Sequence, residues 1–351
     1  MVWCRSTSPV NMSPFTPGVC NLPLDIYPHL PDGLLDLPAD RLVEQLAGPT
    51  LIHIDGATEP ELFVSVLLHG NETSGWEGLR RYLRDHPFPL RSLSVFIANV
   101  HAAADRQRVL PGQQDFNRIW RNADGAGAEL ADALLGAIAD RDYFASIDLH
   151  NNTGHNPFYA VVTDLDATNL GLAYEFSDKA VYVREPDTTL TNAFSGRCPA
   201  VAVELGPVGD PRCDDRAYDY IQRCVALDVI PEAGSDQLNL YESLARVHVA
   251  DEAVFAFTGG EESAPFMLTG GVEAVNFHDL KAGTPFGSSQ LPLSDLLRVL
   301  NTDHQDVTGE YFVKKGTEIV LRRDIVPAMY TTDPFVVRQD CLCYFMSRMQ
   351  L

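Results

Sequence analysis

The spacing of apolar and polar positions changes repeatedly between strand-like and helix-like from about residue 50 to residue 230. Residues 61–68 and 92–100 are compact apolar runs with β-branched members, which is typical of buried strands. Residues 74–84 place Trp76, Leu79 and Leu83 at helical spacing. The same patterns predict further strands at 145–149 and 199–205 and further helices at 129–140 and 216–229. This alternation predicts an α/β fold with a largely parallel sheet that helices cover on both faces.

The pattern changes at the turn-rich stretch that begins at Pro231. Short β-rich runs follow, at 245–249, 253–258, 311–313, 318–321, 335–337 and 341–345. The first 48 residues are rich in Pro, Leu and Asp and are expected to be irregular, apart from one possible short helix around residues 40–47. We therefore predict three regions: an irregular lead-in at 1–48, an α/β domain at 49–235 and a smaller β-rich domain at 236–351.

Composition and charge narrow the class of protein. Of 351 residues, 45% are hydrophobic and 21% charged, as in an ordinary globular protein. Lys and Arg number 26 against 48 Asp and Glu, and a formal charge of −22 opposes binding to nucleic acid or to anionic lipid. No apolar run reaches the roughly 18 residues of a membrane span. Seven irregularly spaced cysteines and the lack of a signal-peptide core favour a cytoplasmic protein without a disulfide framework. The sequence leaves homo-oligomer formation open.

Polar residues that can do chemistry lie at the carboxyl ends of the predicted strands, where open α/β sheets bind ligands. His69 and Glu72 follow the first strand, and two such groups three residues apart can face one cation. Asp148 and His150 share a face of a later strand, and burying them without partners would cost several kcal/mol. A His/Glu/His set is a ligand type of catalytic zinc sites. A hydrogen-bonded core histidine is the alternative.

Two further strand ends add an acid and a group of arginines. Glu204 precedes a Gly-Pro turn, where it is either a general base or a capping carboxylate. Arg106, Arg108 and Arg118 follow the strand that ends near Asn99. Arginine side chains hold carboxylates bidentately and stabilise a developing oxyanion, although solvated surface arginines are the alternative. In so acidic a chain, this group predicts a small carboxylate-bearing substrate.

Five separated motifs resemble, in identity and order, those of the succinylglutamate desuccinylase/aspartoacylase family of the zinc carboxypeptidase superfamily. They are His69-Gly-Asn-Glu72, Asn99-x-x-Ala102 followed by Arg108, Asp115-x-Asn-Arg-x-Trp120, Ile147-Asp-Leu-His-Asn151 and Val203-Glu-Leu-Gly-Pro207. The resemblance covers about residues 50–230. It implies a zinc-carboxypeptidase-like, mostly parallel or mixed sheet flanked by helices, with a smaller C-terminal β domain.

The resemblance also implies roles for individual residues. It implies one Zn²⁺ per chain on His69, Glu72 and His150, with Glu204 as the catalytic acid/base. It further implies that Arg108 polarises the scissile carbonyl, that Asn117 and Arg118 hold the substrate carboxylate, and that Arg197 is the nearest match to a further substrate-binding arginine. Tyr330 is a candidate for the tyrosine that the C-terminal domain contributes in this family.

The implied activity is hydrolysis of the amide bond of a small N-acyl amino acid by metal-activated water, with Glu204 as general base. In that case residues 49–235 are the zinc hydrolase catalytic domain. Two alternatives stay open. One is a zinc carboxypeptidase that acts on short peptides, and the other is a non-catalytic zinc-dependent binding protein on the same scaffold.

Overall fold

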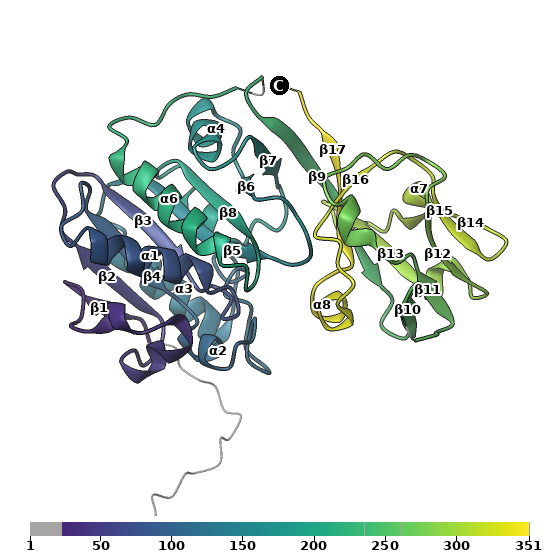
Figure 1. The fold of residues 1–351 in the computed structure, drawn as a ribbon, viewed down its shortest axis with the longest axis horizontal. Coiled ribbons are helices and arrows are strands. Elements are labelled where there is room, and N and C mark those ends of the chain that lie inside the picture. Colours follow the sequence, from purple (N-terminus) through teal and green to yellow (C-terminus); the bar gives the residue numbers. More distant parts are fainter. Residues whose placement is uncertain (1–22, 235, 261, 351) are drawn as a thin grey trace, which may run out of the picture.

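The chain folds into two lobes that lie side by side (Figure 1). The computed structural model describes residues 23–350 apart from 235 and 261. A twelve-stranded mixed sheet runs from the first lobe into the second, which also contains a five-stranded sheet. The mixed sheet with flanking helices and the separate C-terminal sheet confirm the fold class that the sequence predicts.

The centre of the large sheet is parallel and its flanks are mixed. Four adjacent strands run parallel: β4 (Leu93–Ile97), β3 (Glu61–Val66), β5 (Tyr143–Asn152) and β8 (Ala200–Pro207). Beyond β4 lie β2 (Thr50–Ile54), which is antiparallel to it, and β1 (Asp25–Tyr27). Beyond β8 lie the antiparallel β6 (Tyr159–Val162), then β7 (Lys179–Tyr182) and β9 (Asn239–Val249).

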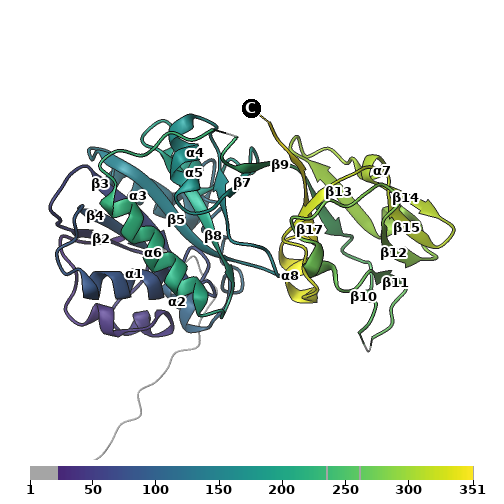
Figure 2. The ribbon, with the colours of Figure 1, turned by 45° about the horizontal axis from the view of Figure 1, so that its top comes forward.

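Helices cover both faces of the sheet in the first lobe (Figure 2). One face buries its apolar side chains against α1 (Ser74–Asp85), α4 (Ala167–Tyr174) and α6 (Arg212–Ala226). The other face packs on α3 (Gly125–Ala137) and α5 (Leu190–Phe194). In β5, Ile147 and Leu149 belong to the first core, so Asp148 and His150 project from the opposite face.

The second lobe continues the large sheet. Strand β9 pairs with β17 (Cys343–Arg348) and β13 (Leu297–Asn301), and β17 pairs with β16 (Val326–Ala328). The five-stranded sheet consists of β10 (Phe255–Phe257), β11 (Phe266–Leu268), β12 (Pro285–Ser289), β15 (Glu318–Leu321) and β14 (Phe312–Lys315). Because β9 is hydrogen-bonded to β7, the β-rich region is joined to the α/β region through the sheet itself.

One local expectation is wrong. Residues 335–337 are not a strand but part of α8 (Pro334–Gln339), because the Asp333 side chain accepts hydrogen bonds from the backbone N–H groups of Phe335 and Val336 and caps a helix. In the lead-in, the 3₁₀ helix Ala39–Glu44 overlaps the short helix expected around residues 40–47. The described part of this region also contains β1 and the 3₁₀ helix Leu34–Asp36, and both 3₁₀ helices bury leucines in the main core.

The structure describes five of the seven cysteines. Cys198, Cys213, Cys224, Cys341 and Cys343 carry free thiols, while Cys4 and Cys20 lie outside the described residues. Within residues 23–350, apart from 235 and 261, we find no helix with the length and apolar character needed to cross a membrane.

Candidate active site

The loop that carries His69 and Glu72 is held tightly against α2 (Val100–Ala104), the short helix that follows β4. A Cβ atom on Gly70 would lie 2.2 Å from the backbone carbonyl carbon of Ala102, so only glycine fits at this position. The Gly70 N–H donates to the carbonyl of Arg108, 3.0 Å away. This packing brings the loop after β3 and the arginine segment after β4 to the same edge of the sheet.

His69, Glu72 and His150 converge at that edge. The Glu72 carboxylate lies 2.9 Å from Nδ1 of His69 and 2.8 Å from Nδ1 of His150. All three residues are at most 5% exposed, and one ligand atom from each lies within 4.8 Å of the others. Two imidazole nitrogens and a carboxylate are the donor set of catalytic zinc sites. The cluster could therefore hold a metal ion.

A carboxylate also orients each histidine from its far side. Nε2 of His69 donates to Asp115, 3.0 Å away, and Nε2 of His150 donates to Asp148, 2.8 Å away. This fixes both rings with Nδ1 turned towards Glu72. Metal-ligating histidines typically make such a hydrogen bond through their second nitrogen.

The charges in the cluster stabilise one another. Burial raises the pKa of Glu72, but His69 and His150 together hold that pKa well below its ordinary value. Burial likewise opposes ionisation of Asp115, while His69 and Arg108 keep its pKa low. Burial lowers the pKa of His150, but the negative charges of Asp148 and Glu72 outweigh this effect and raise that pKa above its ordinary value. Both carboxylates are therefore ionised at neutral pH, as a cation site requires.

We expect Asp148→Asn to weaken metal binding by about 10- to 100-fold, the usual effect of losing a carboxylate behind a ligating histidine. Asparagine keeps the size of the side chain but removes the charge that orients His150. Competition with a chelator of known zinc affinity measures the change. Asp105→Asn, an exposed acid at the end of α2, serves as the matched control. Equal zinc affinity in Asp148→Asn and the native protein would contradict the assignment.

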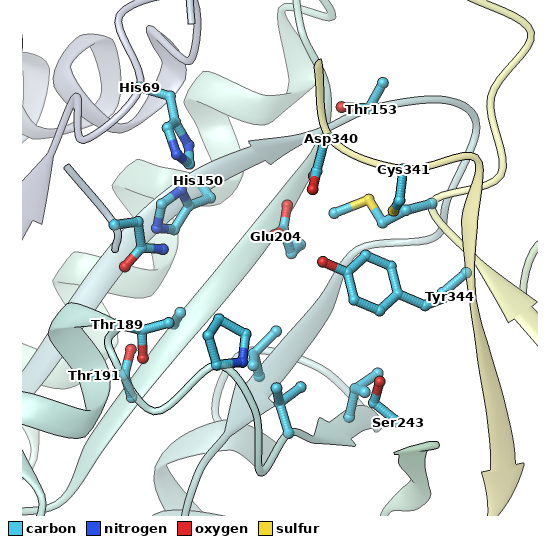
Figure 3. A pocket seen from close by; sticks show the side chains of 18 of the residues that line it. His69, His150, Thr153, Thr189, Thr191, Glu204, Ser243, Asp340, Cys341 and Tyr344 are labelled. Atoms are coloured by element: carbon cyan, nitrogen blue, oxygen red, sulfur yellow. The ribbon is translucent and has the colours of Figure 1, made fainter. Parts of the chain in front are cut away.

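Glu204 lies next to this cluster on β8. It is the register partner of His150, so both side chains project from the same face of the sheet. Its Oε2 atom is buried without a hydrogen-bond partner, and burial raises the pKa of Glu204 to about 7. Figure 3 shows Glu204 between His150 and Tyr344, with the tyrosine hydroxyl turned towards it. A buried carboxylate without a partner, facing a cavity, is suited to accept and release a proton.

Arg108, Asn117 and Arg118 all line the cavity that adjoins Glu204. Arg108 lies 3.1 Å from Asp115 and 3.4 Å from Glu72, and these acids raise its pKa although burial lowers it. Asn117 accepts a hydrogen bond from the Leu190 N–H through its side-chain oxygen. Arg118 donates to the Asn117 carbonyl, and no carboxylate of the described residues pairs with it in an ion pair. Arg118 is therefore the cation of this group that is free to bind a substrate carboxylate.

Two of the sequence-predicted residues are not part of this cavity. Arg197 precedes β8, at the opposite end of the strand from Glu204, where it donates to the carbonyls of Ile138 and Ala139. Tyr330 is 1% exposed and stacks on Phe286 within the core of the second lobe. The structure thus corrects both suggestions.

The cavity residues that the sequence motifs did not identify include Tyr159, Asp340 and Tyr344. Tyr344 lies on β17, whose predicted run at 341–345 contains it, and its hydroxyl is turned towards Glu204 (Figure 3). Tyr159 is the register partner of Glu204 on β6. Alternation within the predicted run could have placed Tyr344 on one face, but only the pairing of β17 with β9 brings it to the cavity.

Comparison with known proteins gives a family match and several solved structures with a similar fold. The family model of the succinylglutamate desuccinylase/aspartoacylase catalytic domain matches residues 58–226. No curated protein sequence matches the chain. Among solved structures, the succinylglutamate desuccinylase of Chromobacterium violaceum is similar, with 16% identity, a TM-score of 0.52, and coverage of 84% of this chain and 86% of that one. Murine aminoacylase 3 has 16% identity and a TM-score of 0.54, with coverage of 83% and 97%.

A third similar structure is the succinylglutamate desuccinylase/aspartoacylase of Rhodobacter sphaeroides, at 16% identity and a TM-score of 0.53, with coverage of 85% and 88%. At such low identity these likenesses concern the fold. The family match includes the segments that carry the histidine cluster, the arginines and Glu204, and it supports a hydrolytic deacylase. Residues 58–226 therefore match the catalytic domain of the succinylglutamate desuccinylase/aspartoacylase family.

Proposed function

We propose that the protein is a zinc-dependent hydrolase that cleaves the amide bond of a small N-acyl amino acid. The observation that carries the proposal is the juxtaposition of the His69, Glu72 and His150 cluster with the unpartnered Glu204 carboxylate at one end of a cavity lined by Arg118. The family match supports the reaction class.

The cluster fits one zinc ion per chain. Its two nitrogen donors and one carboxylate are all buried, and each imidazole is oriented by its own acid. When bound, zinc supplies a Lewis acid that polarises a carbonyl and lowers the pKa of a water ligand. Three protein ligands leave a coordination position open for that purpose.

Glu204 would move the proton in this reaction. Its Oε2 atom is free to accept a proton from the attacking water and then to give it to the leaving amine nitrogen. A pKa of about 7, raised by burial, suits a group that must do both near neutral pH. Hydrolysis then yields a free carboxylic acid and a free amino acid.

Arg108 would stabilise the charge that develops on the carbonyl oxygen. Asp115 and Glu72 hold its guanidinium in a fixed orientation at the edge of the cavity. A fixed, permanently charged donor needs no rearrangement as the oxyanion forms. Arg118, with Asn117 beside it, would hold the carboxylate of the amino acid through its planar pair of N–H donors.

The role of Arg118 is tested with a substrate and its analogue. We expect the carboxamide analogue of an N-acyl amino acid to lose at least 10-fold in kcat/KM, because a charge-assisted hydrogen bond contributes about 1.5–3 kcal/mol. Arg118→Lys is expected to raise KM for the carboxylate substrate by about 10-fold, since lysine cannot reproduce the planar fork. Steady-state kinetics on both compounds measures both effects.

Arg121→Lys is the matched control, because Arg121 belongs to the same segment but is exposed and paired with Asp187, 2.7 Å away. It should change KM less than twofold. Equal kcat/KM for the carboxylate and its carboxamide would show that Arg118 does not clamp a carboxylate.

Both lobes would contribute to the active site. We propose that residues 49–235 carry out the chemistry while residues 236–351 shape the cavity wall, since Tyr344, Met346 and Ala328 of the second lobe line it. Faster release of C-terminal residues from short peptides than hydrolysis of N-acyl amino acids would favour the carboxypeptidase alternative. The Glu204 carboxylate argues against a purely binding role, because a binding protein needs no base beside its metal.

A further inference from the structure

We propose that the part of the cavity beyond Glu204 is a subsite for an uncharged hydrocarbon group of the substrate, either the acyl chain or the amino-acid side chain. The inference rests on the proposed function, because it names the substrate class of the same site. Such a subsite would set this chain apart from enzymes whose substrates carry a second carboxylate on the group that is bound there.

The floor of this hydrocarbon subsite is a row of small and branched apolar side chains on the sheet. Ala202 lies two residues before Glu204 on β8 and therefore projects from the same face. Its register partner on β6 is Val161, and the partner of Val161 on β7 is Val181. All three line the cavity. The row extends directly from the proposed general base across three adjacent strands.

The walls of the subsite combine apolar side chains with uncharged hydroxyl groups, which include those of Thr163, Thr189 and Thr191. Val183 and Pro186 come from the segment that follows β7. From the second lobe, the cavity is lined by Ala328, Met329, Val336 and Met346. Met346 is paired with Ser243 across β17 and β9, and the Ser243 hydroxyl is a neutral polar group in this wall. Figure 3 shows this side of the cavity opposite the two histidines.

The charges that line the cavity allow for one substrate carboxylate. Of the described residues that form the lining, the lysine and arginine side chains are Arg108 and Arg118 alone. Arg108 is already paired with Glu72 and Asp115, which leaves Arg118 for a single carboxylate. Asp340 adds a negative charge to the lining, and its nearest cation, Arg246, is 3.8 Å away. A second carboxylate would therefore meet apolar surface and a like charge.

The apolar surface instead strengthens the binding of a hydrocarbon group. Each methylene that moves from water into such a site strengthens binding about fourfold. A chain four methylenes longer than acetyl is therefore expected to gain roughly 10- to 100-fold, once imperfect contact is allowed for. A carboxylate at the end of the same chain removes that gain.

The first experiment compares substrates that differ in one group. N-hexanoyl, N-acetyl and N-succinyl derivatives of one amino acid test the acyl side, and N-acetyl derivatives of leucine and aspartate test the side chain. We expect the hydrocarbon member of at least one set to exceed its carboxylate member at least 10-fold in kcat/KM. The set that shows the preference identifies the group that enters the hydrocarbon subsite. The absence of this advantage for the hydrocarbon member in both sets would overturn the inference.

A binding measurement separates this inference from the proposed function. Calorimetry with hexanoate and adipate, which have equal chain length, is expected to give a Kd at least 10-fold lower for hexanoate with zinc-loaded and zinc-free protein. If no N-acyl amino acid is hydrolysed but hexanoate keeps this advantage, the proposed function fails and the subsite stands. Equal or tighter binding of adipate overturns the subsite, whatever the hydrolytic activity.

A variant that fills the subsite locates it. Ala202→Leu is expected to raise the Kd for hexanoate at least 10-fold, because the larger side chain occupies the floor next to Val161. Ala139→Leu, at an exposed position, is the control and should leave that Kd unchanged. Unchanged hexanoate binding in folded Ala202→Leu would overturn the location. If that variant does not fold, Ala202→Val makes the same test with a smaller side chain.

Discussion

Replacing Glu204 by glutamine is expected to lower kcat at least 100-fold while the zinc content stays near that of the native protein. Glutamine matches glutamate in size and hydrogen-bonding reach but cannot accept a proton from water, and loss of a general acid–base group typically costs 10²–10⁴-fold. Glu204 is the register partner of His150 but is not part of the His69, Glu72 and His150 cluster. Its loss should therefore separate catalysis from metal binding.

Metal analysis and steady-state kinetics on the same preparation measure both quantities. Glu232→Gln is a suitable control because Glu232 is exposed, and it should leave kcat and zinc content unchanged. Turnover of Glu204→Gln within a few-fold of the native rate would show that Glu204 is structural. Loss of zinc together with activity would instead place Glu204 among the metal ligands.

Replacing His150 by alanine should remove most of the zinc and, with it, nearly all activity. The change deletes one of three donors and leaves Asp148 without its hydrogen-bond partner beside Glu72. Two carboxylates would then lie close together in a buried site with fewer compensating positive groups. We therefore expect weaker zinc binding by several orders of magnitude, measured by metal analysis after dialysis against a chelator.

His278→Ala provides the control, since His278 is exposed in the second lobe and contacts the backbone carbonyl of Asn276. It should retain full zinc and full activity. Native zinc content in a folded His150→Ala variant would show that the third ligand lies elsewhere. Far-ultraviolet circular dichroism distinguishes that result from unfolding.

Much of the fold is evident in the sequence because its central strands and helices have strong local patterns. The predicted helix at 74–84 corresponds to α1 (Ser74–Asp85), and the predicted strand at 318–321 to β15 (Glu318–Leu321). Strands β6 and β7, of four residues each, are not among the predicted strands. Their place in the sheet depends on pairing with β8 and β9, which are far away in the sequence.

The residues of the candidate metal site can also be predicted from the sequence, because they lie at the ends of strands with strong local patterns. His69, Glu72, His150 and Glu204 lie where predicted parallel strands end, and parallel strands bring their carboxyl ends to one edge. Arg197 was misjudged because proximity in sequence to β8 says nothing about which end of the strand a side chain occupies. Its hydrogen bonds to Ile138 and Ala139 place it at the opposite end.

By itself, the sequence determines the α/β class, the edge at which polar groups gather and the chemical types that gather there. The fold class follows from local periodicity, and the position and chemical types of the polar groups follow from where the strands end. Neighbouring residues in the sequence specify both features. Only the tertiary structure decides what surrounds them: that Tyr344 and not Tyr330 faces Glu204, and that Ala202, Val161 and Val181 form an apolar floor. Cross-strand register joins Val161 to Val181, 20 residues later, and to Ala202, 41 residues later, so no local pattern contains that information.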